Sequence, residues 1–240
     1  MSKIKIVLCI VEGLSDKDSL GLLLSRLFKP YVVEFYIIKG DVTSEFQSKP
    51  YNIEAKLKRF IDLFLKDHKG IKKSDIHRVI HLVDMDGVYV DPNQIMYSRE
   101  AYKNKYHNNH LLSNKVDNVI KRNIRKQDIL NRLYTTSIMW GIPYQIYYFS
   151  CHLEHVLHNQ LNVDSEKKDV MAMQFIDSYI NHQQDFVALM QKVSKKEQFI
   201  DSWEYIKEGN HSIERASNFF IGMKEIIQEI KGESNNGNNT

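Results

Sequence analysis

Three acidic side chains follow two apolar segments of the sequence, and their types and spacing suit metal-dependent chemistry. Glu12 ends the segment IVLCIVE, and Asp84 and Asp86 end the segment HLVDMD. Because Asp84 and Asp86 are two residues apart, their side chains point to the same side of an extended backbone. Carboxylates packed together repel one another unless a cation lies among them, and hard divalent cations prefer oxygen ligands. We therefore expect these three acids to be catalytic and to bind metal.

Two further acids are candidate ligands. Asp16 lies four residues after Glu12, at the expected start of a helix, and Glu154 follows a later apolar segment. Both also have plainer interpretations, because acids favour the first turn of a helix and Glu154 could be a solvated helix residue. Two divalent ions about 4 Å apart can bind the attacking and leaving oxygens of a phosphodiester. The expected cofactor is therefore a pair of Mg²⁺ or Mn²⁺ ions, with Asp16 and Glu154 as additional ligands.

The elements that must position these acids alternate between strand and helix. Apolar, β-branched runs predict strands at residues 3–11, 31–38 and 77–83, and apolar side chains at helical spacing predict helices at 16–28 and 52–68. This β-α-β-α-β order predicts a parallel sheet with right-handed crossovers. The fold class is therefore expected to be α/β, with a Rossmannoid parallel sheet flanked by helices and the acids at the carboxyl ends of its strands.

The alternation stops after the third strand. Residues 88–113 are expected to form a long polar loop and residues 115–134 a helix. Residues 144–149 predict a fourth strand, and a helix should begin at about residue 152. The periodicity of residues 165–231 is mostly helical.

This pattern divides the chain into three parts. Residues 1–160 form the expected catalytic domain, with a helical insertion at about 88–143. Residues 161–231 form a helical C-terminal segment, and the tail 232–240, GESNNGNNT, has the low-complexity composition typical of disorder.

Composition limits the class of protein. The formal net charge of 240 residues is only +3, so charge alone does not indicate a nucleic-acid partner. The two cysteines, Cys9 and Cys151, form neither a disulfide framework nor a CxxC zinc motif. No apolar run reaches the roughly 20 residues of a membrane helix. We expect a cytoplasmic protein without membrane contact.

A basic segment follows the Asp-x-Asp motif directly. Between residues 99 and 132, nine Lys and Arg residues stand against three Asp and Glu residues, and Tyr97, Tyr102 and Tyr106 lie at its start. Lys and Arg neutralise phosphates and tyrosines stack on bases, although a solvated helix surface would show the same pattern. The residues expected to bind nucleic acid, DNA or RNA, are Lys103, Lys105, Lys121, Arg122, Arg125 and Lys126.

The two acidic motifs resemble those of the Toprim family, in which one strand ends in Glu-Gly and a later strand ends in Asp-x-Asp. Here these are IVEG and LVDMDG. The spacing EGLSD, which contains Asp16, is similar to the branch of overcoming-lysogenization-defect (OLD) type nucleases. In that branch another acid follows a later strand, and FSCHLE could supply it as Glu154. The resemblance covers roughly residues 3–160, interrupted by 88–143.

This resemblance implies a Toprim-type endonuclease, a hydrolase that uses carboxylate-held magnesium to cleave phosphodiester bonds. The family also has a basic residue near the metals. The motifs do not show which residue of this sequence corresponds to it, and Lys17, Arg78 and Arg215 are candidates. OLD-like nucleases commonly work with an ATPase. Because the sequence has no GxxxxGK[ST] phosphate-binding loop, that ATPase would be a separate protein. The resemblance thus implies the effector of a bacterial anti-phage (antiviral) defence system.

Other interpretations stay open. The segment DMDGVYVD also resembles the first motif of haloacid-dehalogenase-type (HAD-like) phosphatases, in which Asp84 would be the nucleophile and Asp86 a general acid. That interpretation leaves Glu12 without a role. A Toprim-like domain could instead be a non-catalytic partner that binds nucleic acid or an ATPase. The helical segment 165–231 could form a homo-oligomer surface or pack on its own domain.

Overall fold

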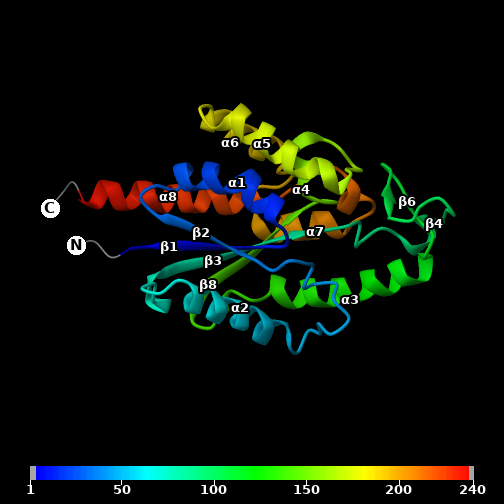
Figure 1. Cartoon of the computed structure of the whole chain (residues 1–240), viewed down its shortest axis with the longest axis horizontal. Helices are drawn as coiled ribbons and strands as arrows, with labels where there is room; N and C mark the ends of the chain where they lie inside the picture. Colours follow the sequence, from blue (N-terminus) through cyan, green and yellow to red (C-terminus); the bar gives the residue numbers. More distant parts are fainter. Residues whose placement is uncertain (1–3, 238–240) are drawn as a thin grey trace.

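A five-stranded sheet with the strand order β2-β1-β3-β8-β7 forms the centre of the computed structural model, which describes residues 4–237 (Figure 1). Its strands are β1 (Ile6–Val11), β2 (Val32–Ile37), β3 (Ile76–Asp84), β8 (Ile142–Phe149) and the short β7 (Ile138–Met139). The first four strands are parallel, and β7 pairs antiparallel with β8. The expected α/β class is confirmed as a mostly parallel mixed sheet flanked by helices.

The connections from β1 to its two neighbours place helices on opposite faces of the sheet. Helix α1 (Leu14–Leu27) leads from β1 to β2, and α2 (Ile53–Asp67) leads from β2 past β1 to β3. Figure 1 shows α1 on one side of the sheet and α2 on the other. Strand order therefore reverses at β1, and the carboxyl ends of strands at such a point commonly bind ligands.

Alternate side chains of β1 enter two separate hydrophobic cores. Val7, Cys9 and Val11 face one core, and Leu8 and Ile10 face the other. The helices packed on the first face are α1, α4 (Leu153–His158), α5 (Lys168–Tyr179), α6 (Gln183–Val193) and α8 (Phe219–Gly237). Those on the second are α2, α3 (Val116–Tyr134) and α7 (Phe199–Lys207). The C-terminal helices thus share both cores with the sheet.

The polar loop expected at 88–113 is instead a small three-stranded sheet. It contains β4 (Ile95–Tyr97), β5 (Lys105–Tyr106) and β6 (Leu111–Ser113), in the order β4-β6-β5. Two- and three-residue strands are too short to show the alternation that identifies a strand in sequence. The insertion has its own apolar core, in which Ile95 and Leu111 pack with Val119 of α3.

Helix α8 extends into the tail for which the sequence predicts disorder. It continues through Gly237, so the expectation for residues 232–237 is wrong, and residues 238–240 lie outside the described part. Glu233 anchors this end by accepting a hydrogen bond from the Tyr31 hydroxyl (2.7 Å) and by pairing with Lys5. Composition reports local tendency only and cannot reveal these distant partners.

Shorter elements complete the fold. Single-turn 3-10 helices occur at Lys73–Asp75, Pro92–Gln94, Ser165–Lys167 and His211–Ile213. Within residues 4–237, none of the helices has both the length and the apolar character needed to cross a bilayer.

Candidate active site

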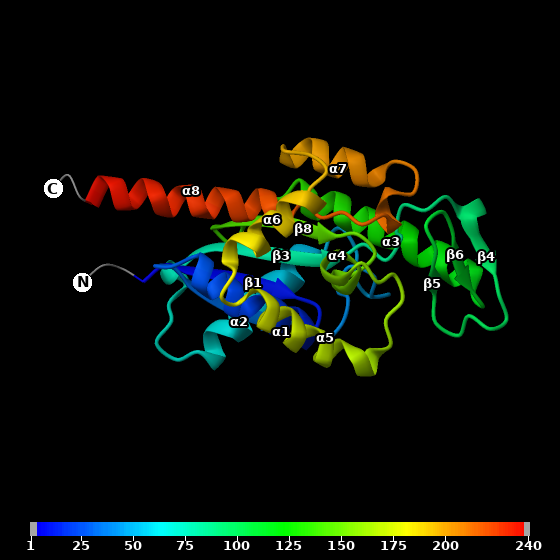
Figure 2. The same cartoon turned by 90° about the horizontal axis from the view of Figure 1, so that it is seen from above.

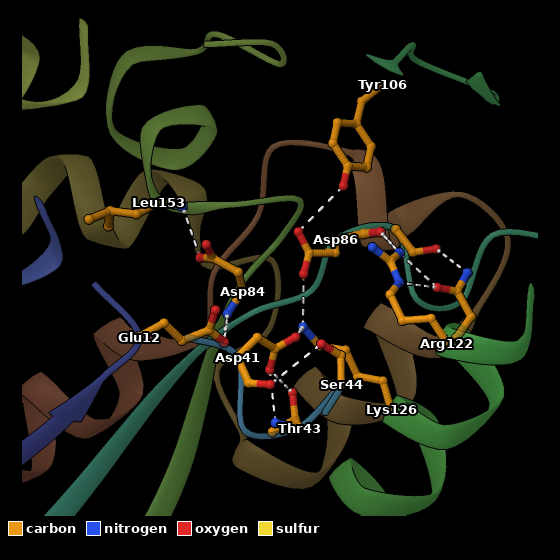
Figure 3. Close-up of polar contacts among 12 residues, drawn as sticks. Glu12, Asp41, Thr43, Ser44, Asp84, Asp86, Tyr106, Arg122, Lys126 and Leu153 are labelled. Atoms are coloured by element: carbon orange, nitrogen blue, oxygen red, sulfur yellow. Dashed lines mark hydrogen bonds and ion pairs between the residues drawn. The ribbon is translucent and has the colours of Figure 1, made fainter. Parts of the chain in front are cut away.

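Carboxylates gather where the four parallel strands end. Because these strands share one direction, their carboxyl ends meet at a single edge of the sheet, as Figure 3 shows. The acids are Glu12 after β1, Asp41 after β2, Asp84 and Asp86 at the end of β3, and Asp16 and Glu154 in the first turns of α1 and α4. The structure thus brings all five sequence-predicted acids to this edge and adds Asp41, which sequence reasoning missed.

Among the described residues, Glu12 and Asp84 accept hydrogen bonds from backbone N–H groups only. The backbone N–H of Asp84 donates to Glu12 Oε1 (3.3 Å), and Asp84 Oδ1 accepts from the backbone N–H of Leu153 at the start of α4 (3.1 Å). Within residues 4–237, neither carboxylate has an ion-pair partner. Burial, with repulsion from neighbouring carboxylates, raises the pKa of both Glu12 and Asp84 well above the ordinary range.

Lys126 holds two other carboxylates together. Its fully buried ammonium group pairs with Asp41 Oδ2 (2.7 Å) and Asp86 Oδ2 (2.9 Å). Burial alone would lower the pKa of Lys126, but the two carboxylates outweigh it and raise the pKa above the usual value. Burial would likewise raise the pKa of Asp41 and of Asp86, and the Lys126 charge instead lowers both. All three groups are therefore charged at neutral pH.

The backbone of Asp86 is fixed as firmly as its side chain. Its φ is +50°, a left-handed conformation, and the following Gly87 has φ +66°. Arg122 Nη2 donates to the carbonyl oxygen of Asp86 (2.8 Å), and the Asp86 N–H donates to the carbonyl of Cys151 (2.7 Å). A Cβ at Gly87 would lie 2.9 Å from Ile213, so the glycine of DMDG is required by close packing as well as by its φ. Asp86 is thus a positioned residue rather than a free ligand.

Asp16 combines the two roles that the sequence left open. Its Oδ2 accepts a hydrogen bond from the backbone N–H of Gly13 (2.9 Å), so it stabilises the first turn of α1, which begins at Leu14 rather than at residue 16. Burial, and repulsion from Glu154 among its neighbours, raises the pKa of Asp16 to about 6. The side chain therefore also belongs to the electrostatic group at the strand ends.

Glu154 contacts two basic side chains, those of His152 and Lys168. It accepts from His152 Nδ1 (2.9 Å) and forms an ion pair with Lys168 Nζ at the start of α5 (2.8 Å). Burial would raise the pKa of Glu154, but His152 and Lys168 lower it to about 2. Glu154 therefore remains charged and is less available than Glu12 or Asp84 for a metal ion.

The donor set as a whole suits a hard divalent cation. Six carboxylates at the strand ends face three basic side chains, those of Arg122, Lys126 and Lys168, which leaves an excess of negative charge. No group of three or more His, Cys, Asp or Glu side chains within residues 4–237 is arranged so that it could hold a metal ion by itself. Glu12 and Asp84 would then supply one or two carboxylates, with water and substrate oxygens completing the shell, as Mg²⁺ prefers.

Two of the strand-end acids line a cleft of about 510 Å³ that the insertion helps to form. Asp84 and Asp86 line it together with Tyr102, Lys103 and Lys105. Other lining residues are Glu100, Asn104, Tyr106, His152, Leu161, Asn162, Val163, Asp164 and Lys168. The cleft therefore connects the carboxylates to part of the segment that the sequence predicts to bind nucleic acid.

The predicted basic residues separate into two groups. Lys103 and Lys105 are exposed and line the cleft, and Lys121 is exposed on α3. Arg122 and Lys126 are one helical turn apart, on the side of α3 that faces the carboxylates, and Lys126 is fully buried there. Contact of these two residues with nucleic acid stays a prediction.

Three other basic residues that the sequence suggests as candidates make contacts away from the strand-end carboxylates. Arg78 pairs with Glu225 and Glu229 of α8, and Arg215 donates to the carbonyl oxygen of Val156 in α4. Arg125, predicted to bind nucleic acid, is half-buried with its guanidinium 5.8 Å from the Phe46 ring centroid.

The remaining candidate, Lys17, is exposed on α1. The basic partners of the site are instead Lys126, Arg122 and Lys168. A usable signal was present for the first two, because their four-residue spacing in a predicted helix puts them on one face.

Comparison with known proteins found no relative of the chain. No protein-family model, curated protein or solved structure matched the chain. Function is therefore argued from the geometry and chemistry of the strand-end carboxylates and the cleft.

Proposed function

We propose that the protein is a metal-dependent nuclease of Toprim type that hydrolyses phosphodiester bonds in nucleic acid. One observation carries the proposal: Glu12 and Asp84, two half-buried carboxylates without ion-pair partners among the described residues, lie side by side at the ends of β1 and β3. The cleft that Asp84 lines also contains Lys103 and Lys105, which suit the phosphates of a polyanion.

Each side chain of the site has a distinct role in this proposal. Glu12 and Asp84 would hold Mg²⁺ or Mn²⁺, which supplies an activated water and stabilises charge on the scissile phosphate. Burial and the neighbouring carboxylate of Asp41 raise the pKa of Glu12, which makes this carboxylate a better proton acceptor than an ordinary glutamate. Lys126 holds Asp41 and Asp86 in place, so Asp86 acts by positioning.

The Toprim resemblance supports the same reaction, because the Glu-Gly and Asp-x-Asp motifs end two neighbouring parallel strands. A separate ATPase partner and a role in anti-phage defence follow from the OLD-like pattern alone. The defence proposal predicts that phage plate less efficiently on cells that carry the protein and its neighbouring genes than on cells with Asp84→Asn. Equal plating would contradict it.

The nuclease proposal is tested by incubating a panel of DNA and RNA with Mn²⁺ and the purified protein. Glu12→Gln and Asp84→Asn should each lower the cleavage rate at least about a hundredfold, because each removes a charged oxygen from the metal site. Asp18→Asn is the matched control, since Asp18 is an exposed acid on α1. Equal rates in all four proteins would reject the site.

The HAD-like phosphatase is supported less well. Its general acid would be Asp86, but burial is outweighed there by Lys126 and Arg122, which lower the pKa of Asp86 and keep it deprotonated. A general acid needs a pKa near the working pH. Turnover of a small phosphomonoester that is lost in Asp84→Asn and kept in Glu12→Gln would favour the phosphatase instead.

A non-catalytic partner role is the remaining alternative. It predicts that Glu12→Gln keeps full biological function while a stoichiometric ATPase co-purifies with the protein.

A further inference from the structure

Two segments that are far apart in the sequence form walls of the cleft and are tied to each other. Residues 102–106 come from the insertion, and residues 161–164 connect α4 to α5. Asn162 joins them, because its Nδ2 donates to the carbonyl oxygen of Tyr106 (2.8 Å) and its Oδ1 accepts from the Tyr106 N–H (2.9 Å). The two walls cannot separate unless both hydrogen bonds break.

Both tied segments are also anchored to the site. His152 Nε2 hydrogen-bonds the carbonyl oxygen of Leu161 (2.9 Å), next to Asn162. The Tyr106 hydroxyl points toward Asp86 and donates to its Oδ1 (3.4 Å), as Figure 3 shows. In Figure 2 the insertion strands β4, β5 and β6 form a projection beyond α3, at the end of the molecule where the cleft lies. The width of the cleft is therefore fixed by the fold.

The size of the cleft suits a few nucleotide units. Its volume of about 510 Å³ is in the range of pockets that bind small molecules, roughly 300–1,000 Å³. Asp84 and Asp86 are among the residues that line this half-open space.

The side chains at the cleft have the chemistry of a single-strand binding site. Tyr102 is 84% exposed, Lys103 follows it directly, and Lys105 comes two residues later. Exposed aromatic rings stack on unpaired bases while lysines contact the backbone, and neither contact needs a particular base. Base faces are available for such stacking in a single strand and are covered in a duplex.

The charge distribution argues in the same direction. A duplex carries one negative charge per roughly 1.7 Å of axis and needs a broad basic surface. Arg122 and Lys126 are committed to Asp86, and the cleft is also lined by the acids Glu100 and Asp164. Among the described residues, the lysines of the cleft that pair with no acid are Lys103 and Lys105, and two such charges suit one or two phosphates.

From these features we infer that the cleft binds single-stranded nucleic acid and excludes a duplex. Tyr102 stacks on a base, Lys103 and Lys105 contact adjacent phosphates, and the Asn162–Tyr106 pair sets the width that excludes the second strand. This inference rests on the proposed function, because it names the substrate class of the same cleft.

Binding is measured first, since it does not require cleavage. The probes are a fluorescent 12-nucleotide single strand, as DNA and as RNA, and the matching duplexes, titrated with the full chain in Ca²⁺ buffer. We expect at least tenfold tighter binding of one of the single strands than of its duplex. Equal or tighter binding of both duplexes overturns the inference.

Cleavage of the same probes in Mn²⁺ separates this inference from the nuclease proposal. If the protein cleaves the single strands and leaves the duplexes intact, both the nuclease proposal and the single-strand inference are supported. Cleavage of duplexes at an equal rate keeps the nuclease and overturns the single-strand inference. Absence of all cleavage contradicts the nuclease, and the binding comparison then still decides the substrate class.

Substitutions in the cleft test which residues cause the preference for single strands. Tyr102→Ala should weaken single-strand binding about tenfold, as the loss of one stacked base does, while Tyr102→Phe should retain it. Tyr51→Ala is the matched control, because Tyr51 is 87% exposed and does not line the cleft.

Asn162→Ala removes the two hydrogen bonds that tie the cleft walls and should raise duplex binding relative to single-strand binding. Unchanged ratios in Asn162→Ala and unchanged binding in Tyr102→Ala overturn these assignments.

Discussion

At the scale of single residues, one buried ammonium group divides the strand-end acids into two kinds. Lys126 ties Asp41 and Asp86 to α3, whereas Glu12 and Asp84 have no comparable partner among the described residues. An excess of buried negative charge is costly unless a cation compensates it. In the proposed site, Asp41 and Asp86 therefore have a structural role, and Glu12 and Asp84 are the acids proposed to bind a ligand.

Replacing Lys126 should destabilise the protein strongly. Lys126→Met leaves Asp41 and Asp86 buried and unpaired, and breaking a buried ion pair in this way costs about 3–5 kcal/mol. The free energy of unfolding, measured by urea denaturation, should fall by about that amount, and Lys126→Met combined with Asp86→Asn should recover part of it. Lys121→Met, an exposed change on the same helix, should have little effect. Equal stability of Lys126→Met and wild type would contradict the buried triad.

His81 predicts a pH dependence of stability. It is fully buried in β3, where Tyr144 Oη lies 2.9 Å from its Nδ1, and burial lowers the pKa of His81 to about 3. The unfolded chain, with an ordinary histidine pKa of about 6.5, binds more protons than the folded chain between these values. Stability should therefore fall as the pH falls through this window, by up to about 1.4 kcal/mol per pH unit from this group.

The measurement is the slope of the unfolding free energy against pH between about 6 and 4.5. His81→Gln, which can still hydrogen-bond Tyr144, should have a smaller slope than wild type. His107→Gln, a change at an exposed position of the insertion, is the control and should keep the wild-type slope. An identical slope in His81→Gln would show that His81 is not the titrating group.

At the scale of elements, sequence was informative where apolar side chains followed a clear period. The runs that became β1 and β3 were long enough to be identified, and their acids were then expected at one edge. Asp41 was missed because a short polar turn separates it from β2, and only the parallel pairing of β2 with β1 brings it near Glu12. The burial of Lys126 was not predicted because a basic residue at an inward helical position has the same sequence signal as one facing solvent.

The contact between α8 and β8 depends on a glycine that sequence alone does not explain. A Cβ on Gly222 would lie 2.4 Å from Cζ of Tyr147, so the helix can pack this closely only without a side chain. Gly222→Ala should therefore destabilise the protein by about 1–3 kcal/mol through overpacking.

Gly232→Ala in the same helix provides the matched control. No atom lies within 4 Å of a Cβ at Gly232, so alanine there should be neutral or stabilise by up to about 1 kcal/mol through helix propensity. Thermal or urea denaturation distinguishes the pair. Equal effects at Gly222 and Gly232 would contradict the close packing on Tyr147.

At the scale of the whole molecule, repulsion among the carboxylates at the strand ends should lower the stability of the metal-free protein, and a bound metal ion should restore it. A ligand that binds only the folded state stabilises it by about 2.7 kcal/mol at a hundred times its dissociation constant. Mn²⁺ should therefore raise the melting temperature of wild type, and Asp84→Asn should abolish that rise. In metal-free buffer Asp84→Asn should melt higher than wild type, because it removes a repelled, buried carboxylate. Asp18→Asn should respond to Mn²⁺ as wild type does, and a full response in Asp84→Asn would exclude Asp84 as a ligand.

The pairing of Lys5 with Glu233 has a consequence for how the molecule can be handled. It holds the start of β1 beside the end of α8, and both figures place these ends opposite the insertion (Figures 1 and 2). An affinity tag, a surface tether or a fluorophore attached at either end would thus leave the cleft unobstructed. The same proximity makes the chain a good subject for circular permutation, with its ends joined by a short linker and reopened at the exposed turn 69–70, which does not line the cleft.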